Sequence, residues 1–345
     1  MYSIRRSTRS GTLAAAAVTV TSLFALSACG GTASGGESGD ELSLVGFSIL
    51  EAANKDVIAA FQDTAAGEET TFTTSYGGSG DQSRAVEAGL DADIVHFSLE
   101  PDVTRLVDAG LVADDWKDTE TKGIVTQSVV AFVVRKGNPK DIHDWDDLVQ
   151  DGVSIITPNP ISSGGARWNT LAAWGQVIAD GGSEKEARQY TTEFFKHASA
   201  LPESARDATT AFQGGNGDVL ISYENEAILA RASGEDFDYV VPDTTLLIEN
   251  PGAVTKDAAP AARDFLDFLV TPDVQKIYAT YGYRPLGDVE GYETEGANDP
   301  ANPFPAPKTL LTIDDDFGGW SEAAGKFFDE ESGVIAEILA ETGQG

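Results

Sequence analysis

The sequence is poor in cysteine, histidine and basic residues. Its 345 residues include one cysteine, three histidines and 23 lysines and arginines, against 56 acidic residues. A single cysteine leaves no internal disulfide. The formal net charge of -33 supplies no cationic surface for phosphates, which argues against a nucleic-acid partner and an anionic membrane surface. At face value, the same charge also argues against a small anion as the ligand.

Long hydrophobic runs are also lacking, and the apolar stretch from Leu13 to Leu26 is too short to span a bilayer comfortably. It follows three arginines, and no acidic residue occurs before position 30, as in a signal peptide. The only cysteine, Cys29, ends the run LSAC, which resembles the lipobox of bacterial lipoproteins. We therefore expect residues 1–29 to be a lipoprotein signal peptide with Cys29 as the lipidated residue. The alternative is an ordinary secretory signal.

Residues 30–41 are rich in glycine and serine and show no hydrophobic periodicity, so they predict a flexible tether. Without the signal segment, the charge balance of the chain becomes 20 − 56 = -36. The body of the protein is expected to work outside the cytoplasm, lipid-anchored to the outer face of the cytoplasmic membrane. The lipid would be its only attachment to that membrane.

From residue 42 onward, β-prone and helix-prone segments alternate, which predicts an α/β fold with a mainly parallel sheet. The continuous apolar run at 128–135 is typical of a strand buried on both faces. Ser183 to Glu186 form a capping box that predicts a helix start. Strands are expected at 43–48, 71–76, 92–97, 128–135, 152–156, 218–223 and 252–254, and helices at 51–63, 82–88, 101–109, 261–270 and 272–281.

The elements group into two units. One α/β unit ends near residue 127, a second ends near 240, and the C-terminal part has too few strands for a sheet of its own. We expect residues 42–127 plus 245–345 to form lobe I and residues 128–244 to form lobe II. A ligand cleft is expected between the lobes, where α/β proteins commonly bind small molecules.

Two glycine-rich segments, Ser75–Ser83 and Thr157–Trp168, each follow a predicted strand and precede a predicted helix. In an open α/β sheet, ligands bind at this end of the strands. Glycine lets the backbone approach a ligand, and the unpaired N–H groups and the dipole of a helix start favour an anion. Ser79 and Ser163 add hydroxyl donors. An anion site and a simple tight turn are both consistent with these segments.

At these loops the chain resembles the sulfate-binding proteins of ABC importers. The resemblance covers about residues 42 to 340, and it implies a two-lobed type II periplasmic-binding-protein fold that closes on sulfate. The matching runs are ITPNPISSGGARWNTLAAWG at 156–175, GDVLISYENEAILA at 217–230, YGYRP at 281–285 and LTIDDDFGGW at 311–320.

The resemblance also implies a set of hydrogen-bond donors, because the family holds dehydrated sulfate without direct contact from a cationic side chain. Tyr223 stands where the family has a tryptophan, and Ser48 stands where it has an aspartate that donates its main-chain N–H. Arg167 is expected beside the site rather than on the anion. The implied donors are the hydroxyls of Ser79 and Tyr223 and the main-chain N–H groups of Ser48, Ser163, Gly164, Gly165 and Ala205.

Sulfate carries no proton at neutral pH, so a site made only of donors leaves none of its hydrogen-bonding groups unpaired. A protonated phosphate would bring a hydrogen with no acceptor, at a cost of about 1–3 kcal/mol. Asp81, two residues after Ser79, would serve such a proton if it faced the ligand, and we expect it to point away and cap its helix. Thiosulfate, molybdate and phosphate are the alternative ligands.

Catalysis is poorly supported, because no histidine shares a motif with a nucleophile or a metal cluster. We expect a monomeric receptor, not an enzyme, that needs no cofactor or metal and delivers sulfate or thiosulfate to ABC permease subunits. A hydrolase or a surface protein without a transport role is the remote alternative.

Overall fold

The computed structural model describes residues 40–329 and 331–344. Cys29, the predicted signal peptide and the predicted tether up to residue 39 lie outside this part. Strand β1 (Glu41–Phe47) already begins at Glu41. The last residue of the predicted tether therefore belongs to the sheet.

The first lobe is built on three parallel strands in the order β2-β1-β3. In β1, Leu42 is buried and the four residues from Leu44 to Phe47 are all buried, as in a strand that is covered on both faces. Each strand leads into a helix that begins beside its carboxyl end. The elements are β1, η1 (Ser48–Leu50), α1 (Glu51–Gln62), β2 (Thr71–Gly77), α2 (Ser79–Glu87), β3 (Ile94–His96) and α3 (Glu100–Asp108).

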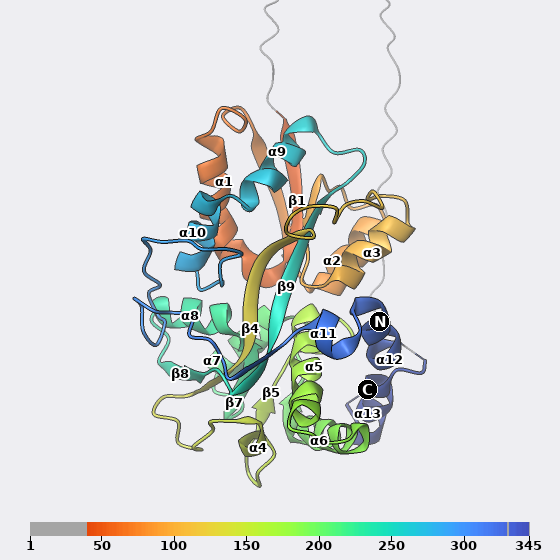
Figure 1. The fold of residues 1–345 in the computed structure, drawn as a ribbon, viewed down its shortest axis with the longest axis vertical. Helices are drawn as coiled ribbons and strands as arrows, with labels where there is room; N and C mark the ends of the chain where they lie inside the picture. Colours follow the sequence, from red (N-terminus) through yellow and green to blue (C-terminus); the bar gives the residue numbers. More distant parts are fainter. Residues whose placement is uncertain (1–39, 330, 345) are drawn as a thin grey trace, which may run out of the picture. The chain divides into compact units, whose positions relative to one another are not determined.

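Two long strands, β4 (Ile124–Arg135) and β9 (Thr244–Val254), carry the chain into the second lobe and back. They pair antiparallel with each other, β9 also pairs antiparallel with β3, and β4 pairs antiparallel with β7. The sheet is therefore mixed rather than mainly parallel, because β9 runs against β3 in the first lobe and β4 runs against β7 and β8 in the second. Figure 1 shows β4 and β9 running from one group of helices to the other.

The second lobe continues the sheet in the order β4-β7-β5-β6, with β8 on β4 and β10 on β9. The predicted capping box is confirmed: Ser183 accepts from the Glu186 N–H, and α6 begins at Glu184. The elements are α4 (Trp145–Leu148), β5 (Ile155–Ile156), α5 (Gly164–Ala179), α6 (Glu184–His197), β6 (Ala198–Ala200), α7 (Ala205–Gln213), β7 (Val219–Tyr223), α8 (Glu224–Ala232), β8 (Phe237–Val240) and β10 (Thr309–Leu311).

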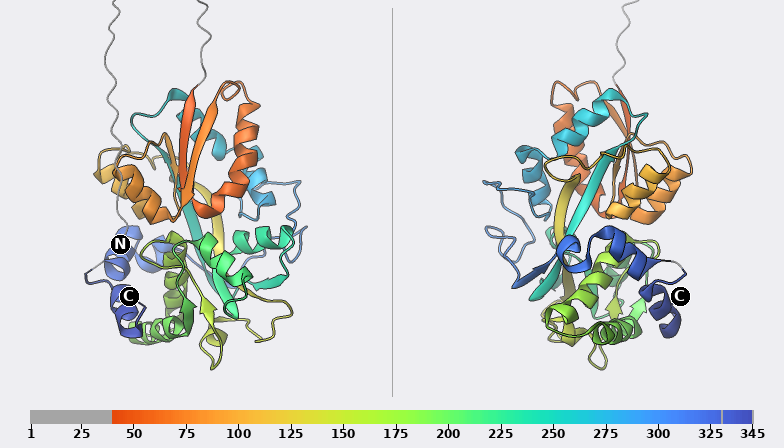
Figure 2. Two further views of the ribbon diagram at one scale, coloured as in Figure 1. Left: turned by 180° about the vertical axis from the view of Figure 1, so that it is seen from behind. Right: turned by 45° about the vertical axis from the view of Figure 1, so that its right-hand side comes forward.

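The C-terminal part divides between the lobes. Helices α9 (Pro260–Leu269) and α10 (Pro272–Thr280) contact α1 of the first lobe. Helices α11 (Ile313–Phe317), α12 (Trp320–Phe328) and α13 (Val334–Thr342) follow, and α13 lies against α6 of the second lobe (Figure 2). We therefore propose that the chain from about Thr309 belongs with lobe II, in place of its predicted assignment to lobe I.

Helix α5 forms the centre of the second lobe. Its side chains are buried on nearly every face, as its sequence of alanines, tryptophans and glycines allows. Trp168 is fully buried and meets the Trp320 ring edge-on at 4.8 Å, so α12 is fixed directly onto α5. This packing holds the first turn of α5 in place at the seam between the lobes.

Candidate anion-binding site

The starts of several helices from both lobes meet at one place. A Cβ atom added to Gly80 of α2 would lie 3.3 Å from the Ser162 carbonyl oxygen, just before α5. A Cβ added to Gly165 would lie 3.3 Å from the Ala205 Cβ at the start of α7. Helix η1, which begins with the half-buried Ser48, also contacts α7. The structure therefore brings the predicted site residues together at the lobe interface.

The first turn of α5 is suited to an anion. Its N-cap, Ser163, is extended and makes no side-chain cap hydrogen bond. The first N–H groups of a helix lack partners within the helix, and the dipole concentrates positive charge there. A Cβ on Gly164 would collide with Ser98, lying 2.6 Å from its Cβ, so only glycine permits this approach of the two lobes.

The Ser163 main-chain N–H does not follow the sequence expectation. It donates to the Asn159 carbonyl oxygen at 2.9 Å, within the loop that precedes α5. The N–H groups of Gly164 and Gly165, one and two residues further on, lie in the first helical turn. The Ser163 N–H is therefore already paired within the protein, while the Ser163 Oγ lies 3.4 Å from the position of a Cβ added to Gly165.

Ser79 lies at the start of α2, and its hydroxyl is engaged with the protein. Its Oγ donates to Asp102 Oδ2 at 2.5 Å and accepts from the Ser98 N–H at 2.9 Å. Both side chains are almost completely buried. To donate to an anion as predicted, the Ser79 hydroxyl would have to rotate its proton away from Asp102.

Burial raises the pKa of Asp102 above its ordinary value, while Arg167 and the hydrogen bond from Ser79 act in the opposite direction. The folded protein thus holds a proton on this carboxyl more tightly than the unfolded chain does. As pH falls toward the unfolded pKa, the carboxyl becomes protonated in the folded protein and its charge no longer has to be buried. The buried charge of Asp102 therefore lowers the free energy of unfolding at neutral pH and above.

Asp102→Asn should therefore be more stable than the wild type at pH 8, by about 1 kcal/mol, and should lose this advantage toward pH 4. The asparagine carbonyl still accepts the Ser79 hydroxyl but carries no charge. Urea unfolding at both pH values measures the difference. The exposed Asp81→Asn is the matched control. An equal or lower stability of Asp102→Asn at pH 8 would contradict the expectation.

Tyr223, at the end of β7, is fully buried and reaches across to the first lobe. Its Oη lies 2.7 Å from Ser98 Oγ, and its ring edge faces Gly165. Trp168 donates its indole N–H to Ser98, 3.0 Å from the carbonyl oxygen and 3.2 Å from Oγ. Ser98 thus connects the first lobe to two residues of the second.

Arg167 and Asp81 both lie beside the donors. Arg167 Nε donates to the Pro160 carbonyl oxygen at 3.0 Å, and its guanidinium lies over the Phe328 ring. Asp81 forms an ion pair with Arg84 on the exposed face of α2. The expectation that Asp81 caps its helix is wrong, because Gly78 occupies the N-cap position and Asp81 lies inside the first turn, where its carboxylate pairs with Arg84.

Two buried carboxylates follow Tyr223, and each has an arginine partner. Glu224 receives a bidentate pair of hydrogen bonds from Arg284, at 2.7 and 3.1 Å. Glu226 Oε1 lies 3.1 Å from Arg206 Nη1. Burial raises the pKa of both carboxyls, and the arginines oppose the rise. Each carboxylate is thus paired with an arginine, and Arg206 lies in the first turn of α7, directly after Ala205.

Sequence reasoning missed Ser98, Asp102 and the role of the Trp168 N–H. Ser98 comes two residues after β3, so the rule that ligands lie at the carboxyl ends of strands could have found it. Asp102 resembles an ordinary acidic residue in a first helical turn, and no signal in the chain sets it apart. The buried ring of Trp168 packs on Trp320, as an ordinary core residue would, and only its N–H reaches Ser98.

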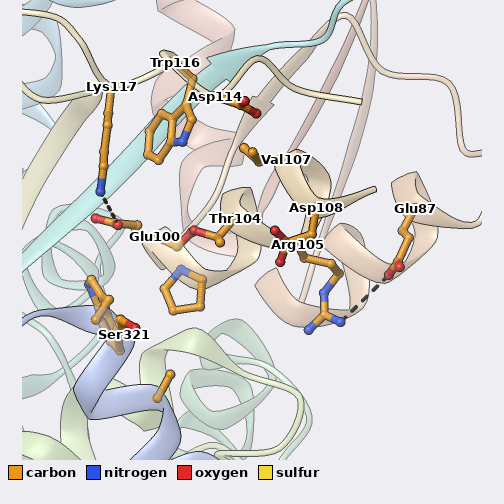
Figure 3. Close-up of a pocket in the computed structure, with 13 residues that line it drawn as sticks. Glu87, Glu100, Thr104, Arg105, Val107, Asp108, Asp114, Trp116, Lys117 and Ser321 are labelled. Carbon is orange, nitrogen blue, oxygen red and sulfur yellow. Dashed lines mark hydrogen bonds and ion pairs between the residues drawn. The ribbon is translucent and has the colours of Figure 1, made fainter. Parts of the chain in front are cut away.

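A cavity of about 690 Å³ lies elsewhere, between α3 and the start of α12 (Figure 3). Its charged side chains are mainly acidic, and its two cations are already paired: Lys117 with Glu100, and Arg105 with Glu87. The net negative charge of the lining would repel a small anion. This cavity is therefore a poor anion site, and the buried cluster at the helix starts is the better one.

Among residues 40–329 and 331–344, no group of three or more His, Cys, Asp or Glu side chains is arranged to hold a metal ion. Within the same ranges, no helix is long and apolar enough to cross a bilayer.

Known proteins are similar to this chain in sequence and in fold. The family model for bacterial extracellular solute-binding proteins matches residues 43–284. The sulfate-binding protein of Synechococcus elongatus is 41% identical, with 93% of this chain and 94% of the relative covered. The thiosulfate-binding protein of Escherichia coli is 37% identical, with 79% and 82% covered.

Among solved structures, the sulfate-binding protein SubI from Mycobacterium tuberculosis H37Rv is 43% identical. It superimposes with a TM-score of 0.78 over 84% of this chain and 99% of that one. These relatives are binding proteins rather than enzymes, and the similarity extends over both lobes. The chain belongs to the family of bacterial extracellular solute-binding proteins.

Proposed function

We propose that the protein is an extracytoplasmic receptor that binds sulfate between its lobes and delivers it to an ABC transporter. The observation that carries the proposal is the convergence of the starts of α2, α5 and α7 on the buried hydroxyls of Ser79 and Tyr223. Dipoles and N–H groups from both lobes then attract a dianion that no single lobe could enclose. The sulfate-binding relatives support the same ligand.

The donors that we assign to sulfate come from both lobes. The hydroxyl of Tyr223 and the N–H groups of Gly164, Gly165 and Ala205 belong to the second lobe, and Ser48 and Ser79 to the first. Ser163 contributes through its hydroxyl. Arg167 steadies the loop that leads into α5 and touches no anion.

The net charge of -36 predicted for the chain without its signal segment does not oppose this function. Exposed charges are screened over about 8 Å at physiological salt, whereas a buried set of oriented dipoles acts at contact distance. The acidic surface keeps an extracellular protein soluble. The charge therefore bears on the surface and on the exclusion of nucleic acid, and not on the choice of ligand.

We also propose how the receptor is attached to the membrane and what it contacts there. The receptor acts as a monomer without catalysis, is attached to the outer face of the membrane through a lipid on Cys29, and presents its closed form to the permease subunits. Metabolic labelling with a fatty acid, compared between wild type and Cys29→Ser, tests the anchor. Thiosulfate is the second candidate ligand, because it too carries no proton at neutral pH and a thiosulfate-binding relative matches the chain.

Isothermal titration calorimetry with sulfate, thiosulfate, molybdate and hydrogen phosphate at pH 8 tests the function. We expect sulfate to bind most tightly, because each of its oxygens accepts from a donor and none of its atoms needs an acceptor. Tight binding of phosphate with none of sulfate would overturn the proposal. A preference for thiosulfate would replace the ligand and keep the site.

A further inference from the structure

Three buried groups form a continuous hydrogen-bonded chain across the lobe interface. The Trp168 indole N–H, on α5, is shared between the Ser98 carbonyl oxygen and Oγ. Ser98 Oγ lies 2.7 Å from Tyr223 Oη. None of the three residues is more than 1% exposed, so water does not compete for these bonds.

The indole sets the direction of this chain. An indole N–H can only donate, whereas a hydroxyl both donates one proton and accepts. Ser98 Oγ accepts from Trp168, and among the described residues Tyr223 Oη is the one acceptor that its own proton can reach. We infer that this proton points at Tyr223, because the buried hydroxyl of Ser98 would otherwise leave it unpaired. Asn250 donates from its side chain to the Ser98 carbonyl oxygen at 3.1 Å, so Ser98 is held from a further side. With Ser98 donating to it, the Tyr223 oxygen accepts one bond, and its own proton is left to donate.

Tyr223 stands where this proton matters. A Cβ added to Gly165 would lie 3.4 Å from Tyr223 Cε1, so the edge of the phenol ring borders the first turn of α5. Burial raises the pKa of Tyr223 well above its ordinary value, so the phenol keeps its proton throughout the physiological range. The hydroxyl thus always has a proton to donate, and it acts as a donor to the site as long as the O–H does not rotate about its C–O bond.

We propose that Trp168 and Ser98 are specificity-determining residues, which hold Tyr223 as a donor and so make the site reject oxyanions that carry a proton. The inference rests on the proposed function, since it concerns the same site. A phenol without this constraint could turn and accept a hydrogen from hydrogen phosphate, which would then leave no group unpaired. When Tyr223 is fixed as a donor, its hydroxyl proton points at the proton of hydrogen phosphate, which then has no acceptor.

The test compares two dianions of similar shape, sulfate and hydrogen phosphate, at pH 8 by calorimetry. In Ser98→Ala, the Tyr223 oxygen loses the donor that faces it and becomes free to accept. We expect sulfate affinity to fall a few-fold and phosphate affinity to rise, so that the sulfate-to-phosphate ratio falls at least tenfold. Trp168→Phe, which keeps an aromatic ring against Trp320, should shift the ratio in the same direction.

Tyr223→Phe supplies the matched reference, because it removes both the donor and the acceptor. The ratio in Ser98→Ala/Tyr223→Phe should equal that in Tyr223→Phe alone, since Ser98 acts through the phenol. Circular dichroism checks that each variant is folded, and Trp168→Phe replaces Ser98→Ala if the latter does not fold.

An equal loss of affinity for both dianions in Ser98→Ala and Trp168→Phe would overturn the inference, because it would reduce the two residues to supports of lobe closure. This result leaves sulfate binding by the wild type intact. A wild type that binds no sulfate would instead overturn the proposed function.

Discussion

Gly164→Ala should weaken sulfate binding by about 5- to 150-fold, equivalent to about 1–3 kcal/mol of overpacking. The new Cβ would lie 2.6 Å from the Ser98 Cβ in the closed protein. Gly164 and Ser98 belong to different lobes, so opening relieves the clash. The cost therefore falls on closure, and each lobe keeps its fold. Calorimetric titration with sulfate measures the change.

Gly164→Pro separates the collision from the loss of a donor. Proline fits the first position of a helix, and the extended Ser163 before it is compatible with proline. The proline variant has the same Cβ but no N–H, so it should bind about tenfold or more weakly than the alanine variant. Equal affinities of the two would show that the Gly164 N–H does not reach the anion.

Gly325→Ala is the matched control for both variants. Gly325 lies within α12, and a Cβ added there meets nothing within 4 Å. Its sulfate affinity should equal that of the wild type. Its free energy of unfolding should rise by up to about 1 kcal/mol, because alanine favours a helix over glycine.

Arg284→Ala should lower the free energy of unfolding by about 3–5 kcal/mol. Glu224 is completely buried and receives two hydrogen bonds from Arg284, so removal of the arginine leaves an uncompensated carboxylate in the interior. Arg284 follows α10, and Glu224 begins α8, so the pair also joins distant segments of the chain. Urea unfolding at pH 7 measures the loss.

The control for this variant is Arg84→Ala, which removes the ion pair with Asp81. Both of those side chains are at least 40% exposed, so the change should be at most about 1 kcal/mol. In Arg284→Ala/Glu224→Gln, most of the lost stability should return, because the buried charge is gone. A loss in Arg284→Ala no larger than in Arg84→Ala would contradict this account of the Glu224 pair.

Local patterns predicted the elements of the first lobe well. Strands at 43–48 and 71–76 and helices at 51–63 and 272–281 coincide with β1, β2, α1 and α10 to within two residues. The sequence could not show that β4 and β9 pair antiparallel, because strand direction depends on partners far apart in the chain. It also could not show that α13 lies against α6, since an amphipathic helix does not specify what covers it.

The site was predictable where motifs mark it. The glycine-rich loops marked the segments that contain Ser79, Gly164 and Gly165, because backbone approach to a ligand leaves a glycine signature. The resemblance to sulfate-binding proteins then implied which residues in these segments donate. Ser98 and Asp102 have no such signature: each is a single common residue whose position depends on the closure of the lobes. Hydrogen-bond partners within the protein, such as Asp102 for Ser79, are set by tertiary contacts alone.

The pairing of β4 with β9 limits how the lobes can move. Two strands bonded along a ladder resist sliding, because every bond would break together, but they can bend and twist where the ladder is interrupted. The register shifts between Ile124 and Thr126, opposite Pro251 and Asn250. We therefore expect the lobes to open by a hinge motion about this bulge. Sulfate would then leave from the side of the cleft farthest from β4 and β9.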